Sequence, residues 1–137
     1  MNRGFTLLEL IIVIIIIGIL AVVGLAQYNM TSESAKTAEP KAILGAARKA
    51  ELSYYLDKGA YTSSYSDLGI SAPTSCASTH YFHYDISLDS GNERVRSLRC
   101  TTGGKSPNAS RAYWVILRLN GTHYSIWEDG SGNTGFW

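Results

Sequence analysis

The chain opens with an apolar run that is longer than any other in the sequence. From Phe5 to Ala26 it carries a single charged side chain, Glu9, and residues 10–26 include no strongly polar side chain. As a helix, the run would extend about 33 Å, which is enough to cross the hydrocarbon core of a bilayer. A helix that is apolar on every side lies either in lipid or inside a bundle of helices.

The one carboxylate in this run, Glu9, is its anomaly. A carboxylate within a membrane-spanning segment costs a few kcal/mol and marks a functional site by default. We therefore expect a positively charged partner that neutralises Glu9, and we expect that partner to be part of the function.

Polar positions return after the run, and residues 41–57 have the pattern of an amphipathic helix. Apolar residues recur there at spacings of four, three and four, which places them on one helical face. They are Ile43, Ala47, Ala50 and Tyr54. Charged residues, Arg48, Lys49 and Glu51, take the other positions. Pro40 interrupts the helix ahead of this segment, and Gly59 is placed to end it.

The rest of the chain predicts a loop followed by strands. Residues 59–76 are rich in Gly, Ser and Thr, with one short turn expected at 66–68. Alternating or continuous apolar patterns then predict strands at 81–88, 95–101, 112–119 and 122–128, with Asn120-Gly121 as a hairpin turn. The expected fold class is α+β: a long helix whose second half packs on an antiparallel sheet of about four strands.

Charge and cysteine usage narrow the function classes. Lys and Arg total 12 against 11 Asp and Glu, so nothing indicates an electrostatic footprint for nucleic acid. Arg3 and the amino terminus are the only positive charges before the span, which places the N-terminus in the cytoplasm.

Cys76 and Cys100 both follow the span, in the exported part of the chain, where a disulfide is permitted. We predict this disulfide, worth about 3.5 kcal/mol by chain entropy; two free buried cysteines are the alternative.

Side chains with the potential for chemistry are few. His80 and His83 are three residues apart, so on a strand they face opposite sides and make a poor chelating pair. The sequence contains no haem-attachment, phosphate-loop or H-E-x-x-H motif. We expect no catalytic residues, no cofactor and no metal, and therefore not an enzyme.

The residues Gly4-Phe5-Thr6-Leu7-Leu8-Glu9-Leu10, followed by the apolar run, resemble the class III signal of type IV pilins and of the related type II secretion pseudopilins. The resemblance implies that a prepilin peptidase cuts after Gly4 and N-methylates Phe5. It also implies a single-pass inner-membrane precursor that an assembly platform and its ATPase build into an extracellular, helical homopolymer. Glu9 is similar to the family's glutamate that neutralises the amino terminus of a neighbouring subunit.

The expected layout is a leader at 1–4, a membrane-spanning and filament-core half-helix at 5–32, an amphipathic half-helix at 33–58 and a head at 59–137. The expected function is a structural subunit of a type IV pilus or pilus-like filament. The alternatives are a major pseudopilin of a type II secretion system and a membrane-anchored periplasmic binding domain. Glu128-Asp129 weakly resembles the calcium loop of major pseudopilins.

The processing implied by the resemblance is directly testable. We expect the mature protein to begin at N-methylated Phe5, because Gly4 precedes an aromatic residue at the cytoplasmic edge of the span. Mass spectrometry of the purified protein measures this. A mature start at Gln27, after the small residues Gly24 and Ala26, would instead indicate an ordinary secretory signal peptide.

Overall fold

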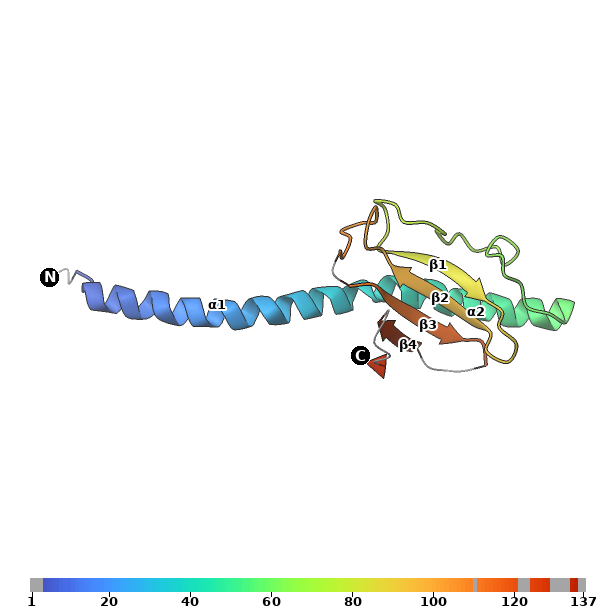
Figure 1. Ribbon diagram of the computed structural model, residues 1–137, viewed down its shortest axis with the longest axis horizontal. Helices are drawn as coiled ribbons and strands as arrows, with labels where there is room; N and C mark the ends of the chain where they lie inside the picture. The colour runs from blue at the N-terminus through green and yellow to red at the C-terminus, as the bar shows by residue number, and fades with distance from the viewer. Residues whose placement is uncertain (1–3, 110, 121–123, 129–133, 136–137) are drawn as a thin grey trace. The chain divides into compact units, whose positions relative to one another are not determined.

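A computed structural model describes residues 4–109, 111–120, 124–128 and 134–135 of the chain (Figure 1). The chain divides into two compact units, Met1–Ala35 and Lys36–Trp137, and each is described here by itself.

Helix α1, Leu7–Lys36, makes up most of the first unit. Its first nineteen residues are almost all aliphatic, and their side chains are exposed, from 40% for Ile11 to 76% for Leu7. By length and composition, the described residues contain one helix that is apolar enough to cross a membrane. The expectation of a long, all-round apolar N-terminal helix is confirmed.

The helix is interrupted at Thr37, three residues before the proline that we expected to interrupt it. Pro40 lacks an N–H group, and its ring clashes with the carbonyl four residues earlier, which is that of Lys36. Helix α1 ends at this residue, and α2, Ala38–Lys58, begins after Thr37. Pro40 therefore occupies the first turn of the second helix, where a proline is tolerated.

Helix α2 presents a different face to the core from the one that the sequence predicted. Its buried residues are Pro40, Leu44, Ala47 and Glu51. This set keeps the expected spacing but begins three residues earlier in the chain. Ala47 belongs to both sets, whereas Ala50 and Tyr54 are only partly buried. The end of the helix is as expected: Gly59 adopts a left-handed φ of 76° and donates its N–H to the carbonyl of Tyr55 at 2.8 Å.

The second unit is completed by an antiparallel sheet in the order β1-β2-β3-β4-β5. The strands are β1 Phe82–Ser87, β2 Arg94–Arg99, β3 Tyr113–Arg118, β4 Tyr124–Glu128 and the two-residue β5 Thr134–Gly135. Helix α2 packs across β2 and β3 on one face (Figure 1). The predicted α+β arrangement is confirmed, and each of the four expected strands is present: three with slightly shorter bounds, and β2 one residue earlier than expected at its start and two at its end. Of the turn expected at Asn120-Gly121, Gly121 lies outside the described residues.

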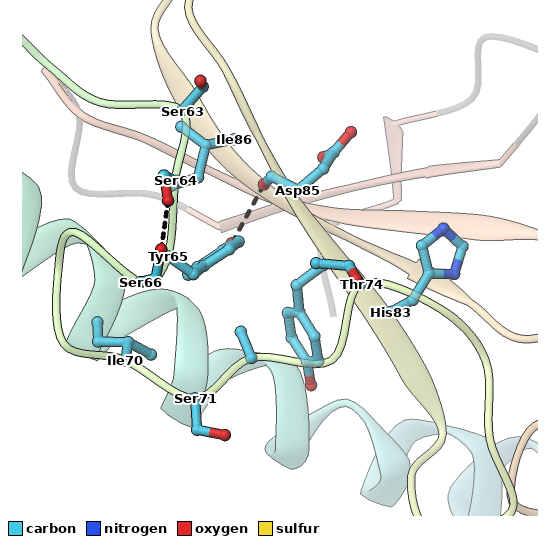
Figure 2. Close-up of a pocket in the computed structure, with 12 residues that line it drawn as sticks. Ser63, Ser64, Tyr65, Ser66, Ile70, Ser71, Thr74, His83, Asp85 and Ile86 are labelled. Atoms are coloured by element: carbon cyan, nitrogen blue, oxygen red, sulfur yellow. Dashed lines mark hydrogen bonds between the residues drawn. The ribbon is translucent and has the colours of Figure 1, made fainter.

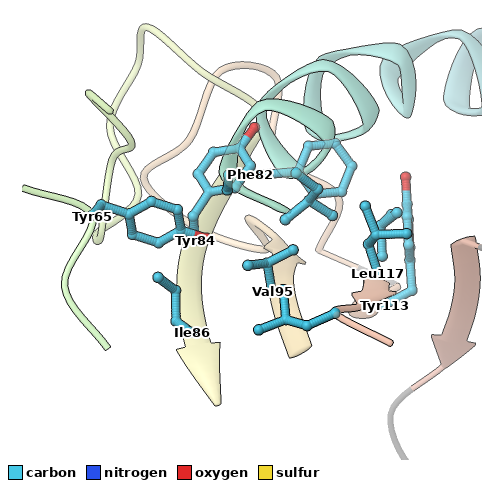
Figure 3. Close-up of a cluster of buried hydrophobic side chains, with 11 residues drawn as sticks. Tyr65, Phe82, Tyr84, Ile86, Val95, Tyr113 and Leu117 are labelled. Carbon is cyan, nitrogen blue, oxygen red and sulfur yellow. The ribbon is translucent and has the colours of Figure 1, made fainter. Parts of the chain in front are cut away.

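Burial alternates along the strands as the sequence pattern predicted. In β1 the side chains of Phe82, Tyr84 and Ile86 are buried, while the residues between them face outward. The core that these side chains build is largely aromatic and aliphatic (Figure 3). It consists of Leu44, Ala47, Tyr65, Phe82, Tyr84, Ile86, Val95, Tyr113, Val115, Leu117 and Leu119.

A disulfide joins Cys76 to Cys100, with 5.8 Å between the two Cα atoms. Cys76 lies in the loop before β1, and Cys100 directly follows β2. The bond thus ties the loop between helix and sheet to the second strand, which confirms the predicted pairing.

Removal of this disulfide tests its share of the stability. We expect Cys100→Ser to lower the free energy of unfolding of the head by about 2–5 kcal/mol, because the unfolded chain regains the freedom that the closed loop removes. Thermal unfolding followed by near-ultraviolet circular dichroism measures this. Chemically reduced wild-type protein is the control, and it should lose as much. Peptide mapping that recovered both thiols free in native material would contradict the prediction.

Glu51 was expected among the polar positions of α2, and this expectation was wrong: its side chain is fully buried. One carboxylate oxygen accepts the N–H of Thr62 at 3.2 Å, and the other has no hydrogen-bond partner among the described residues. Burial raises the pKa of Glu51 above its ordinary value of 4.5, although the Thr62 bond opposes the shift. The folded head therefore binds a proton at Glu51 more tightly than the unfolded chain does.

This raised pKa predicts a pH dependence of stability. The contribution of protonated Glu51 is fully present below about pH 4.5 and declines as the pH rises through the raised value. We expect Glu51→Gln to remove this part of the decline, measured as the unfolding midpoint between pH 4.5 and 8. Asp57→Asn, at an exposed position of the same helix, is the matched control. An unchanged pH slope in Glu51→Gln would contradict the assignment.

Candidate functional site

The start of α1 holds the residues that the sequence singled out for processing and assembly. The helix begins at Leu7, so the backbone at Gly4 and Phe5 is not helical, and both residues are exposed. A Cβ atom built on Gly4 would meet nothing within 4 Å. Packing within the chain therefore does not require glycine at this position, and the Gly4–Phe5 bond lies in open, non-helical backbone.

Glu9 closes a capping box with Thr6. Thr6 donates its backbone N–H to the Glu9 carboxylate at 2.9 Å and its hydroxyl to the same oxygen at 2.8 Å. In return, the Glu9 N–H donates to the Thr6 hydroxyl oxygen at 3.3 Å. Threonine before the first helical residue and glutamate at the third is the pattern that forms this motif. The carboxylate is thereby held at the positive end of the helix dipole, bonded to Thr6, which directly follows Phe5.

The other predicted residues lie in the second unit, away from the start of α1 in the chain. Cys76 and Cys100 form the disulfide. His83 lies on β1, whereas His80 precedes the strand, so the assumption that both histidines share a strand was wrong. The Nδ1 atom of His83 lies 3.3 Å from the Sγ atom of Cys76. No pattern in the sequence indicates this contact, because it depends on how the loop before β1 folds back.

Glu39, in the first turn of α2, receives several hydrogen bonds from the start of β1. Its carboxylate accepts the N–H groups of Tyr81 and Phe82 at 3.1 and 3.3 Å and the hydroxyl of Tyr84 at 3.2 Å. Burial, reinforced by the charge of Glu39, raises the pKa of Tyr84, so its phenol stays protonated and can donate. These bonds fix the first turn of α2 to the sheet, which sequence reasoning missed.

Arg99 organises the loop that follows β2 from a buried position, with 1% of its surface exposed. Its guanidinium donates to the carbonyls of Tyr81, Cys100 and Ser106 at 3.0, 3.3 and 2.6 Å. Ser106 adopts a left-handed φ of 45°, a conformation that a non-glycine residue rarely holds without support. The Arg99 bond to its carbonyl is that support.

The outward face of the sheet carries a paired arginine. Arg96 donates from Nε to the Asp85 carboxylate at 2.7 Å and makes a second bond through its terminal nitrogen. Hydrogen bonding to Asp85 raises the pKa of Arg96. The guanidinium also lies 4.8 Å from the ring centroid of Trp114. Because its charge is matched within the chain, Arg96 is a structural residue of this face.

A groove of about 690 Å³ lies between the loop 63–74 and β1 (Figure 2). Its lining is rich in hydroxyl groups, from Ser63, Ser64, Ser66, Ser71 and Thr74. Tyr65 crosses the groove and donates its hydroxyl to the carbonyl of Asp85 at 3.1 Å (Figure 2). The hydroxyl groups that line the groove suit hydrogen bonding to a ligand rather than covalent chemistry.

Comparison with known proteins supports the interpretation of the chain's first residues. A family model described as the prokaryotic N-terminal methylation motif matches residues 1–25. The chain is 35% identical over 148 aligned residues to a type IV major pilin protein, PilE, of Neisseria gonorrhoeae, covering 98% of this chain and 87% of the relative. No solved structure matches the chain.

Other relatives share shorter regions. The chain is 28% identical over 121 residues to a type IV major pilin protein, PilE1, of N. gonorrhoeae, covering 80% of this chain and 67% of that protein. It is 32% identical over 96 residues to the type IV major pilin protein PilA of Myxococcus xanthus, covering 70% and 42%. The match thus spans less than half the length of some relatives. The near-complete match to a gonococcal PilE, together with the methylation motif, shows that the chain belongs to the type IV pilin family.

Proposed function

We propose that this protein is a structural subunit of a type IV pilus. One observation carries the proposal: an exposed Gly4–Phe5 bond precedes an all-round apolar run, residues 7–26, whose only carboxylate, Glu9, accepts hydrogen bonds from Thr6, the residue after Phe5. The matched relatives are named as major pilins, which favours a pilus over a secretion pseudopilus. Nothing in this role requires catalysis by the subunit.

The apolar surface of α1 must be covered first by lipid in the precursor and then by other helices in the filament. Its aliphatic side chains are exposed in the isolated chain, and exposed apolar surface of this extent is not stable in water. A lipid bilayer covers it in the precursor, with the N-terminus in the cytoplasm. In the filament, the same surface is covered by the α1 helices of other subunits, because an all-round apolar helix is also suited to the centre of a bundle.

Processing supplies the charge that Glu9 needs in the filament. Cleavage after Gly4 by a prepilin peptidase creates a cationic amine on Phe5, which is then N-methylated. In the membrane-resident subunit, the capping box with Thr6 already provides hydrogen bonds to the Glu9 carboxylate. In the drier filament core, the amine of a neighbouring Phe5 pairs with Glu9 and fixes the axial register between otherwise featureless helices, a role for which buried polar groups are known.

The proposal implies further partners. The subunit assembles with copies of itself, after processing by the peptidase, through an inner-membrane platform driven by an ATPase. Its location changes from the inner membrane to the outside of the cell. Residues 1–4 are the leader, 5–32 the membrane-spanning and filament-core segment, 33–58 the amphipathic segment and 59–137 the head.

Substitution of Glu9 tests the assembly role. We expect Glu9→Ala to be inserted and cut after Gly4 normally yet to yield few or no filaments, because a buried amine without its partner is strongly destabilising. Glu9→Gln should give an intermediate number, since it keeps shape and hydrogen bonding but loses the charge. Electron microscopy of sheared fibres measures this, with immunoblots to show equal mature protein in the membrane.

The capping box provides a matched control. Thr6→Ala removes both Thr6 hydroxyl bonds, at a cost of about 1 kcal/mol in helix capping, but leaves the Glu9 charge in place. If the charge of Glu9 is what assembly requires, Thr6→Ala forms many more fibres than Glu9→Ala. Equal loss of fibres in both variants would assign the effect to capping, and wild-type fibre numbers in Glu9→Ala would rule out an assembly role.

A further inference from the structure

Three side chains of metal-ligating type meet in the head. The Sγ atoms of Cys76 and Cys100 and the Nδ1 atom of His83 all lie within 4.8 Å of one another. They come from three separate segments: the loop before β1, the residue after β2, and β1 itself. Two thiol sulfurs and an imidazole nitrogen are a ligand set that zinc and other thiophilic cations prefer over oxygen donors.

In the folded structure the two sulfurs are bonded to each other, but a newly synthesised chain carries them as thiols. We propose that Cys76, Cys100 and His83 form a binding site for one thiophilic divalent cation, such as zinc, before the disulfide closes. The head would then hold either the cation or the disulfide at this place, but never both.

The arrangement fits the coordination of such an ion. Tetrahedral zinc with Zn–S bonds of about 2.3 Å places two thiolate sulfurs roughly 3.8 Å apart, and a nitrogen ligand lies at about 2.0–2.1 Å. The sulfur–sulfur separation is the one to compare with the present arrangement, and it lies within the 4.8 Å that spans the three ligand atoms. With three protein ligands, the fourth position is left to water.

The surrounding backbone encloses the site from one side. Cys100 is 1% exposed, and a Cβ atom at Gly104 would lie 2.3 Å from the Cβ and 3.0 Å from the Sγ of Cys100. Only glycine therefore allows the loop 101–108 to lie so close to this sulfur. Cys76 and His83 are only partly buried, which leaves access for an ion from their side.

Contacts that do not involve the disulfide hold the same segments in place. Lys105 donates its N–H to the carbonyl of His80 at 2.8 Å, and buried Arg99 donates to the carbonyl of Ser106 at 2.6 Å. The Tyr84 N–H donates to the carbonyl of Pro73 at 2.8 Å, which fixes the loop before β1. The three ligands thus stay near one another while the cysteines are thiols.

The chemistry balances without any further component in the protein. On binding, each thiol releases one proton to solvent, and the two thiolates and the neutral imidazole donate electron pairs to the cation. When the disulfide forms, the two thiolates join in one sulfur–sulfur bond and give two electrons to an external disulfide oxidant, whose own sulfur–sulfur bond breaks and which takes two protons from solvent to become a dithiol. Both sulfur ligands are lost in this step, and the cation is released.

Cobalt(II) is a suitable spectroscopic probe. Full-length protein in detergent is reduced with a phosphine, which adds no competing thiol, and is titrated with Co²⁺. We expect one Co²⁺ per chain, with thiolate-to-cobalt charge-transfer absorption and the visible bands of tetrahedral cobalt, and displacement by Zn²⁺. Non-reduced protein should show none of these bands. Absence of the bands in reduced protein, or equal binding in non-reduced protein, would overturn the proposal.

Variants assign the ligands. His83→Ala should weaken binding at least tenfold, because the loss of a ligand costs no less than the loss of its supporting contacts. Ser87→Ala, four residues further along β1 and bonded through its hydroxyl to Asp89, is the matched control and should bind as wild type does. Cys76→Ser should reduce the charge-transfer absorption. If His83→Ala proves unfolded by circular dichroism, His83→Gln replaces it; unchanged affinity in the folded histidine variant would contradict the assignment.

Discussion

The constraint on which the rest of this protein depends is that its first helix cannot be covered by the chain that carries it. From Leu7 to Leu25, helix α1 is aliphatic on nearly every side, and the described side chains of this stretch are exposed. Covering them requires lipid or other helices. The rest of the chain therefore has to fold by itself, with α2 as the helix that supplies its core.

Pro40 marks the boundary between the helix that the chain does not cover, α1, and the helix that packs in its core, α2. Pro40 lacks the N–H that would donate to the carbonyl of Lys36, and its ring clashes with a helical carbonyl at that position. Helix α1 ends at Lys36, and α2 begins at Ala38. Glu39, immediately before the proline, then accepts hydrogen bonds from Tyr81, Phe82 and Tyr84. The same turn thus ends one helix and attaches the next to the sheet.

How much the sequence predicts depends on whether a feature is set locally. The alternation in β1, the left-handed Gly59 and the apolar α1 follow from neighbouring residues, and all were predicted. The predicted buried face of α2 was wrong at Glu51, because the burial of this residue is accompanied by a hydrogen bond from Thr62, which lies outside the helix. From the sequence alone, a charged residue within a helix is predicted to face solvent, because a hydrogen-bond partner elsewhere in the chain is not visible there.

The candidate sites also differ in whether local sequence or a tertiary contact reveals them. Glu9 was found because a lone carboxylate in an apolar run is visible in the sequence, and its bonds to Thr6 obey a local motif. His83 was dismissed because its sequence neighbour His80 points elsewhere, yet its relevant neighbour is Cys76, brought back by the loop before β1.

The capping box also bears on how Glu9 changes partners. An isolated buried carboxylate would have to be protonated or remain costly until assembly, whereas Glu9 already accepts two hydrogen bonds from Thr6 at the positive end of the helix. The donor of these bonds, Thr6, directly follows Phe5, the amino terminus that the proposed cleavage would create. In the proposed filament, an amine from a neighbouring subunit would therefore join a carboxylate that is already oriented and partly satisfied. The strength of the new pair then comes from charge, which the neutral donors of Thr6 do not supply.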